Sequence, residues 1–226
     1  MLIIFDCDGV LIDSEIIACS AGAEMMTRLG HAMTMHEFAS RFTGIPSADT
    51  WTLIEAEIGR AIPEAVREAE LQRTRDRFAA ELQPIAGAQN MLRRLQSDKC
   101  VASSTGLVAL RRNLGLVGLL DLFEPGIFSA SQVARGKPAP DVFLYAASQM
   151  GTDPESCLVL EDSVAGVTAA RRAGMRVAGF TGGSHADPTL PRRLRTAGAE
   201  TILAKHEDVL DFLAGEGATI APAAAA

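Results

Sequence analysis

LIIFDCDGVL, at residues 2–11, begins with an apolar run that stops at Asp6, and a second aspartate follows at Asp8. A short run of branched and aromatic residues predicts a strand that is buried on both faces, as in a parallel sheet. Because side chains alternate along a strand, we expect Asp6 and Asp8 to point the same way and Cys7 to point away. Gly9 allows a sharp exit, so both carboxylates are expected at the carboxyl end of the strand, where open α/β sheets bind ligands.

CVASSTG, at residues 100–106, is a second strand of small residues, and it ends in hydroxyls before an expected helix over 107–114. Hydroxyls and free backbone N–H groups at a helix start form a site for an anion. The same hydroxyls can instead cap the helix. We expect Ser103 to bind the anion and Ser104 or Thr105 to cap the helix.

RGKPAPD, at residues 135–141, precedes an expected helix over 142–150. Pro140 suits the first turn of that helix, and Pro138 stiffens the segment that carries Lys137. A single lysine is more often solvated than catalytic. The interest of Lys137 therefore depends on the groups that the fold brings to it.

CLVLEDS, at residues 157–163, is another buried strand that ends in acids. Ser163 is expected to be the N-cap of a helix over 164–173 that Gly174 ends. Glu161 and Asp162 would add two negative charges to the pocket of Asp6 and Asp8.

Taken alone, Asp6 and Asp8 could simply cap the loop that follows the strand. Four carboxylates that converge with one lysine, however, require a metal ion. Oxygen ligands without a nearby histidine or cysteine suit a hard, octahedral and partly hydrated cation. The sequence therefore predicts a Mg²⁺ site and phosphate chemistry at one edge of a sheet.

The strands and helices follow a pattern that predicts an α/β fold, a doubly wound parallel sheet with an inserted all-helical cap domain. Strands are expected near 100–103, 126–129, 157–160, 176–180 and 201–203. The insert is expected to be helical near 36–42, 49–58 and 64–81, after a first helix whose apolar stripe is Ile17, Ala21, Met25 and Leu29. We expect a core domain of residues 1–14 and 83–226 and a cap domain of residues 15–82.

Composition is consistent with this organisation. The chain has 226 residues, of which 48% are hydrophobic, enough for a substantial core. The net charge of −7 disfavours a nucleic-acid partner, and no segment reads as a membrane span or a signal peptide, so we expect a cytoplasmic protein. The four cysteines read as core residues, and the four histidines as surface or loop residues.

Four ordered segments resemble the motifs of the haloacid dehalogenase (HAD) superfamily: FDCDGVLIDSE at 5–15, the strand of Ser103, GKPAPD at 136–141 and EDSVAG at 161–166. The resemblance runs from Leu2 to about Gly182, and it is closest to the β-phosphoglucomutase-like and sugar-phosphatase branch with a helical cap. It implies a Rossmann-like core and an enzyme that transfers a phosphoryl group.

The resemblance also implies roles for single residues. Asp6 matches the nucleophile that becomes an aspartyl phosphate, and Asp8 matches the general acid and base. Ser103 and Lys137 match the groups that hold the phosphoryl oxygens.

The family's metal site can be carried over in the same way. Magnesium would be held by the carboxylates of Asp6 and Asp162 and by the backbone carbonyl of Asp8, with Glu161 acting through water.

The cap separates phosphatases from mutases in this branch. Mutases carry a histidine soon after the first motif and an arginine shortly after the cap glycine, where this chain has Ala18 and Ser47. Without that arginine a bisphosphorylated intermediate loses its clamp. We therefore expect a magnesium-dependent phosphatase, with a β-phosphoglucomutase-type mutase and a non-catalytic phosphometabolite-binding protein as alternatives.

The expected partner is a small phosphate ester, a sugar phosphate or a sugar-acid phosphate resembling 6-phosphogluconate, with no nucleic acid or membrane. A monomer or a weak homodimer is expected. The candidate substrate contacts, each of which could equally be a cap or turn residue, are Ser14, Glu15, Thr43, Gly44, Ser47, Ser104 and Thr105.

Overall fold

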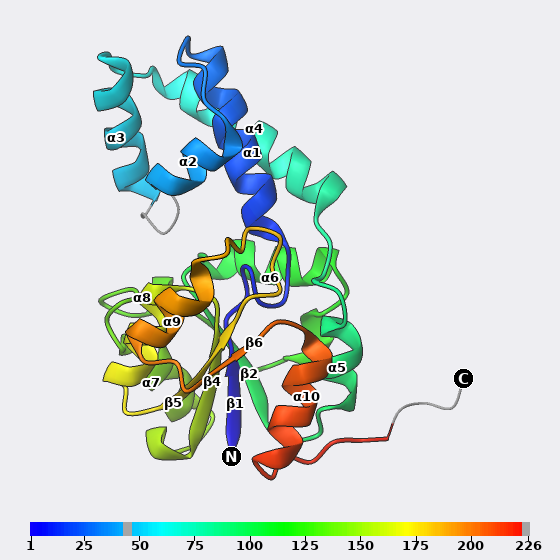
Figure 1. The fold of residues 1–226 in the computed structure, drawn as a ribbon. Coiled ribbons are helices and arrows are strands. Elements are labelled where there is room, and N and C mark those ends of the chain that lie inside the picture. Colours follow the sequence, from blue (N-terminus) through cyan, green and yellow to red (C-terminus); the bar gives the residue numbers. More distant parts are fainter. Residues whose placement is uncertain (43–46, 223–226) are drawn as a thin grey trace. The chain divides into compact units, whose positions relative to one another are not determined.

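The computed structural model describes residues 1–42 and 47–222 (Figure 1). The chain divides into two compact units, one of Met1–Asp13 with Gln83–Ala226 and one of Ser14–Leu82. The first unit is built around a sheet, and the second is helical where it is described. Along the described residues, no helix combines the length and the apolar character that crossing a membrane requires.

The described residues of the first unit form a six-stranded parallel sheet in the order β3-β2-β1-β4-β5-β6. The strands are β1 (Leu2–Phe5), β2 (Lys99–Ser103), β3 (Ile127–Ser129), β4 (Cys157–Glu161), β5 (Arg176–Phe180) and β6 (Thr201–Leu203). The predicted α/β fold is confirmed, and the strands expected after residue 83 begin and end within one residue of their predicted bounds. Strand order reverses between β1 and β4, and ligands of doubly wound sheets bind at such a switch point.

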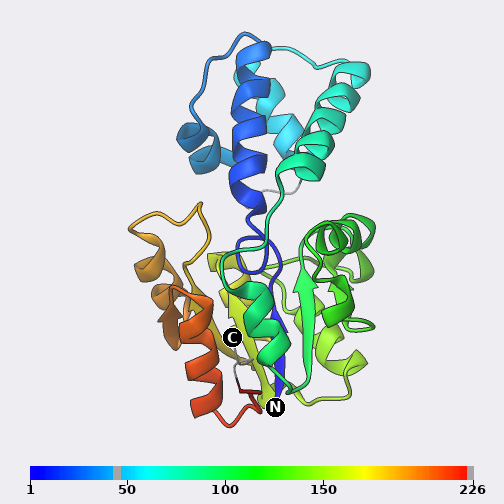
Figure 2. The same cartoon turned by 90° about the vertical axis from the view of Figure 1, so that its right-hand side faces the viewer.

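Helices cover both faces of this sheet (Figures 1 and 2). They are α5 (Ala88–Arg94), α6 (Leu107–Leu116), α7 (Asp141–Gln149), α8 (Val164–Arg172), α9 (Leu190–Ala197) and α10 (His206–Gly215), with short turns η1 (Leu120–Leu122), η2 (Ala130–Gln132) and η3 (Pro154–Ser156). On one face Leu2 and Ile4 pack with Phe143 of α7, Val167 of α8 and Leu194 of α9. The opposite face carries α5 and α10 (Figure 2). Because both faces are covered, β1 and β4 are buried along their whole length, which explains their continuous apolar runs.

The second unit contains α1 (Ser14–Arg28), α2 (Met35–Phe42), α3 (Ser47–Ile58) and α4 (Glu64–Glu81). Its core is formed by buried Met25, Met26, Phe42, Ile54 and Ile62. A Cβ at Gly22 would lie 2.2 Å from the ring of Phe38, so the glycine lets α2 pack closely on α1.

The burial predicted from the sequence is correct for the cysteines and wrong for one of the histidines. Each of the four cysteines is a buried free thiol, as expected. Among the histidines, the expectation of surface or loop positions is wrong for His206, which is fully buried in α10. Its ring stacks on Phe180 at 4.6 Å between centroids, and its Nε2 lies 2.9 Å from the carbonyl oxygen of Val10. No local pattern around His206 indicates these long-range contacts.

His206 is expected to make the protein acid-sensitive. Burial lowers the pKa of His206 to about 4, against 6.5 for an ordinary histidine. Since the unfolded chain then binds the proton more readily, the stabilisation is complete above pH 6.5 and is lost as the pH falls from 6.5 to 4. The pKa difference corresponds to about 3 kcal/mol. In urea titrations, His206→Gln, which keeps an N–H for Val10 and does not titrate, should gain stability relative to the wild type over this range. Parallel pH curves would contradict the prediction.

Candidate active site

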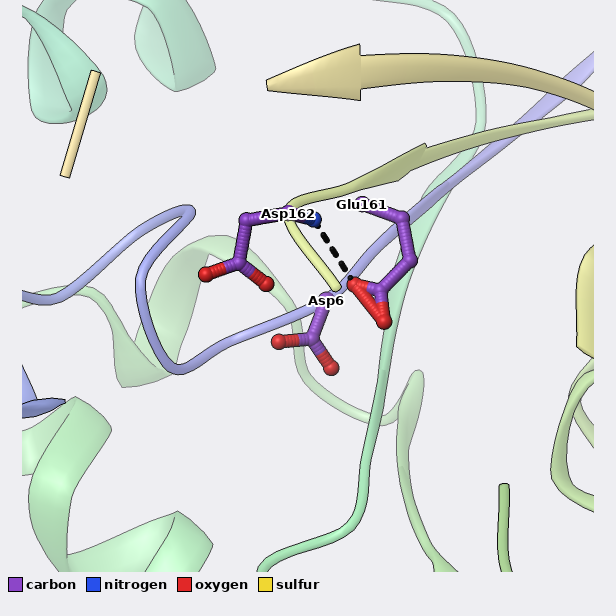
Figure 3. Close-up of side chains that lie close together, drawn as sticks. All are labelled: Asp6, Glu161 and Asp162. Atoms are coloured by element: carbon purple, nitrogen blue, oxygen red, sulfur yellow. Dashed lines mark hydrogen bonds between the residues drawn. The ribbon is translucent and has the colours of Figure 1, made fainter. Parts of the chain in front are cut away.

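Three acidic residues meet at the carboxyl ends of β1 and β4. The two strands are paired with Phe5 opposite Leu160, and the N–H of Asp6 donates to the carbonyl of Leu160 at 2.9 Å. Asp6 therefore follows β1 at the level where Glu161 ends β4. Figure 3 shows the carboxylates of Asp6, Glu161 and Asp162 grouped around one space. One oxygen atom from each of these three buried residues lies within 4.8 Å of the others.

Lys137 is buried beside this cluster. Its Nζ lies 2.5 Å from Oδ1 of Asp6 and 3.4 Å from Oε1 of Glu161. The same ammonium group lies 4.8 Å from the centre of the Phe143 ring, on the first turn of α7. The lysine segment between β3 and α7 thus brings the positive charge that the sequence reasoning placed in this pocket.

Glu161 is held by contacts on both of its oxygens. The hydroxyl of Ser163 donates to Oε1 at 2.7 Å, and the N–H of Asp162 donates to Oε2 at 3.0 Å. Ser163 Oγ also accepts from the N–H of Gly166 at 3.0 Å, which confirms it as the N-cap of α8. The start of α8 therefore fixes the glutamate in the pocket.

Gly166 leaves the space that Glu161 occupies, and filling it is expected to damage the site. A Cβ at this position would lie 1.4 Å from Oε1 of Glu161, so Gly166→Ala must displace the carboxylate from Lys137 and Ser163. We expect a loss of activity of at least about tenfold, because a small displacement of a positioned group costs catalysis heavily. Steady-state kinetics will measure it. Gly115→Ala in α6 is the matched control, since its Cβ would meet only Leu120 at 3.9 Å and the helix should tolerate alanine. Equal activity of the two variants would contradict the prediction.

Asp8 lies beside the end of β2. Its Oδ2 accepts hydrogen bonds from Thr105 Oγ1 at 2.7 Å and from Ser103 Oγ at 3.2 Å. The N–H of Thr105 donates to Ser103 Oγ at 3.0 Å, so the three residues form one connected group. The loops after β1 and β2 are joined through Asp8.

The expected capping of α6 by Ser104 or Thr105 is wrong. Gly106 occupies the N-cap position without a side-chain bond, and Ser131 Oγ accepts from the N–H of Leu107 at 3.3 Å. Thr105 instead uses its hydroxyl on Asp8, a partner that lies 97 residues away. Ser104 is exposed at the end of the strand.

The cluster carries more negative than positive charge. Burial raises the pKa of Asp6 to about 8, against the opposing charge of Lys137 and with support from the charges of Glu161 and Asp8. Burial likewise raises the pKa of Glu161. The pKa of Lys137, which burial alone would lower, is raised by Asp6 and Glu161. Three buried carboxylates beside one ammonium group need a further proton or a cation for balance.

The residues of this cluster fit a divalent cation. Their carboxylate oxygens are close enough to share one ion, and a bound ion would offset the excess negative charge. An all-oxygen donor set is the one that hard cations prefer. The ends of the predicted strands thus identified Asp6, Glu161 and Asp162 as residues that meet at one edge of the sheet.

His185 is a residue of this site that the sequence reasoning missed. It lies in the loop after β5, half-buried, with Nε2 3.0 Å from Oδ2 of Asp162. The expected loop position of His185 is confirmed, but its contact with Asp162 was not predicted. The available signal was that the loop after β5 opens at the same edge of the sheet as the acids.

The remaining predicted substrate contacts belong to the helical unit. Ser14 and Glu15 begin α1, and Ser47 begins α3. Thr43 and Gly44 lie outside the described residues. Binding of substrate by these five residues stays a prediction.

Comparisons with known proteins agree with this geometry. The family model of the haloacid dehalogenase-like hydrolases matches residues 1–174. The 6-phosphogluconate phosphatase of Escherichia coli (strain K12) is 31% identical over 198 residues, which are 86% of this chain and 88% of the relative.

Two solved structures are similar over nearly the whole chain. A haloacid dehalogenase-like protein from Agrobacterium tumefaciens superimposes with a TM-score of 0.85 and 38% identity, covering 96% of this chain and 98% of that one. A hydrolase of the same family from Deinococcus radiodurans, with bound phosphate and sodium, gives a TM-score of 0.84 and 30% identity over 98% of each chain.

Proposed function

We propose that this chain, which belongs to the haloacid dehalogenase-like hydrolases, is a magnesium-dependent phosphatase that hydrolyses a small phosphorylated sugar or sugar acid through an aspartyl phosphate. The observation that carries the proposal is the buried group of Asp6, Lys137, Glu161 and Asp162 at the ends of β1 and β4. A carboxylate beside an ammonium group, in a place shielded from water, is suited to attack phosphorus.

The first step would form the bond between a carboxylate oxygen of Asp6 and phosphorus. The bond from phosphorus to the sugar oxygen breaks, and Asp8 gives that oxygen a proton. Lys137 and Ser103 stabilise the charge on the phosphoryl oxygens as it moves. A cation bound by Asp6 and Asp162 would neutralise part of the same charge.

The second step would return Asp6 to its free form. Asp8 takes a proton from a water molecule, whose oxygen attacks phosphorus. The bond from phosphorus to the carboxylate oxygen of Asp6 breaks, and inorganic phosphate leaves. The hydrogen bond from Thr105 holds Asp8 in one orientation for both proton transfers. Thr105, predicted as a substrate contact, would on this geometry act through Asp8.

The substrate class is supported by the E. coli relative, whose name specifies 6-phosphogluconate as substrate. A sugar-acid phosphate is therefore the first candidate for this chain. The bound phosphate in the D. radiodurans hydrolase supports a phosphate ester more generally. Ala18 and Ser47 stand where mutases of this branch carry a histidine and an arginine, and this difference favours hydrolysis over transfer of the phosphoryl group back to a sugar.

A panel of substrates tests the proposal. Release of inorganic phosphate from p-nitrophenyl phosphate, 6-phosphogluconate and hexose phosphates should require Mg²⁺ and should stop when EDTA removes it. Isomerisation of glucose 1-phosphate without phosphate release would instead establish a mutase. Binding of the esters without any turnover would establish a phosphometabolite-binding protein.

A further inference from the structure

The loop between β5 and α9 places His185 against one of the three clustered acids. Nε2 of His185 lies 3.0 Å from Oδ2 of Asp162, and the side chain of Asp162 is 7% exposed. Nδ1 of His185 is buried and has no hydrogen-bond partner among the described residues. A hydrogen on Nδ1 would be a buried donor without an acceptor, whereas a hydrogen on Nε2 has the carboxylate of Asp162 nearby. Nε2 of His185 is therefore in polar contact with the carboxylate of Asp162.

Two glycines make room for this contact. A Cβ at Gly9, where φ is +77°, would lie 1.9 Å from Oδ2 of Asp162 and 2.7 Å from Cε1 of His185. A Cβ at Gly183 would lie 2.8 Å from Nδ1 of His185 and from the carbonyl oxygen of Gly9. The loops after β1 and β5 thus approach each other closely, and the imidazole and carboxylate fit between them.

A separate contact fixes the loop that carries the histidine. The N–H of Ser184 donates to Oδ1 of Asp13 at 3.1 Å, and the hydroxyl of Ser184 donates to Oδ2 of the same carboxylate. Asp13 ends the first segment of the sheet-containing unit, 171 residues before Ser184. Because the neighbouring residue is bound by two hydrogen bonds, the backbone of His185 is restrained.

We propose that His185 is a positioning residue for the divalent cation, acting through Asp162. Its contact with Oδ2 restricts rotation of a carboxylate that contributes an oxygen to the cluster with Asp6. Losing such an outer partner of a metal ligand typically lowers metal affinity by about 10- to 100-fold. The inference rests on the proposed metal-dependent function and names a residue that the motifs of the sequence do not contain.

The binding of Mg²⁺ to the metal-free protein, measured by titration calorimetry, tests the role of His185. His185→Leu removes the donor and should weaken Mg²⁺ binding by about tenfold or more. His185→Gln keeps an N–H at a similar reach and should recover most of the affinity. Ser184→Ala should weaken binding by a smaller factor, because it loosens the loop and keeps the imidazole. His31→Leu changes an exposed histidine and is the matched control, with no expected change.

The kinetics then separate this role from others. With saturating Mg²⁺, kcat of His185→Leu should approach that of the wild type, and the concentration of Mg²⁺ needed for half activity should rise. Equal Mg²⁺ affinity of His185→Leu and wild type, or an equal loss in the leucine and glutamine variants, would overturn the inference alone. A wild-type protein that binds no Mg²⁺ would overturn the proposed function as well. Thermal unfolding in EDTA checks that each variant is folded.

Discussion

Asp6→Asn is expected to abolish phosphate release and leave the metal-free fold at least as stable as the wild type. The amide cannot attack phosphorus, so the loss should be on the order of 10⁴-fold or more, as when other catalytic nucleophiles are removed. Stability should not fall in parallel, because Asp6 is a buried carboxylate in a cluster with excess negative charge. Lys137 retains Glu161 as a partner in the variant. Phosphate release and thermal unfolding in EDTA measure the two effects.

The pH dependence sharpens this prediction. Burial raises the pKa of Asp6 to about 8, above its value of 3.8 in an ordinary environment. The folded protein therefore holds a proton that the unfolded chain releases, and this contribution is complete below pH 3.8 and is lost as the pH rises through 8. In EDTA, Asp6→Asn should gain stability relative to wild type between pH 5 and pH 9.

Asp98→Asn supplies the comparison, because Asp98 is an exposed acid before β2. Its activity and its pH profile should match those of the wild type. Substantial turnover by Asp6→Asn would rule out attack by this residue. A constant stability difference between pH 5 and pH 9 would contradict the raised pKa.

The positions where strands end could be predicted because they depend on local patterns. LIIF and CLVLE are continuous apolar runs, which is typical of strands covered on both faces, and each ends in an acid. Parallel strands bring their carboxyl ends to one edge of the sheet. The strand ends alone therefore predict that Asp6, Glu161 and Asp162 meet at this edge, as they do. Ser163 and Gly174 similarly mark the ends of α8 through local backbone chemistry.

Long-range partners could not be predicted in the same way. Thr105 has the hydroxyl of a helix cap, and local preference predicts that role, but in the fold the hydroxyl donates to Asp8 instead. His206 has the polarity of a surface residue, yet Phe180 and Val10 surround it in the core. His185 lies in a loop after Gly183 and Ser184, and the close approach of the loops after β1 and β5 gives it Asp162 as a partner. In each case the contact joins segments that are far apart along the chain, and a local sequence pattern does not show that the fold brings them together.

Lys137→Met is expected to impair both activity and stability of the metal-free protein. The ammonium group is the positive charge within hydrogen-bonding distance of Asp6 and Glu161, and its side chain is 4% exposed. Removing one partner of a buried ion pair typically costs about 3–5 kcal/mol, because the remaining charge is left uncompensated. Methionine keeps an apolar contact with the ring of Phe143, so packing should change little. Phosphate release should fall by about 10²- to 10³-fold as the fixed charge beside the phosphoryl group disappears.

Magnesium should reverse part of the stability loss in Lys137→Met, since a bound cation offsets the same carboxylates. The rise in unfolding temperature on adding Mg²⁺ should therefore be larger in the variant than in the wild type, whereas activity should stay low. Lys99→Met is the matched control, because Lys99 is a half-buried lysine of β2 whose Nζ donates to the carbonyl of Leu95 at 2.8 Å. If Lys137→Met and Lys99→Met lose the same stability and activity, the charge of Lys137 has no special part in the site. If Mg²⁺ shifts wild type and Lys137→Met equally, the lysine and the cation do not share the same carboxylates.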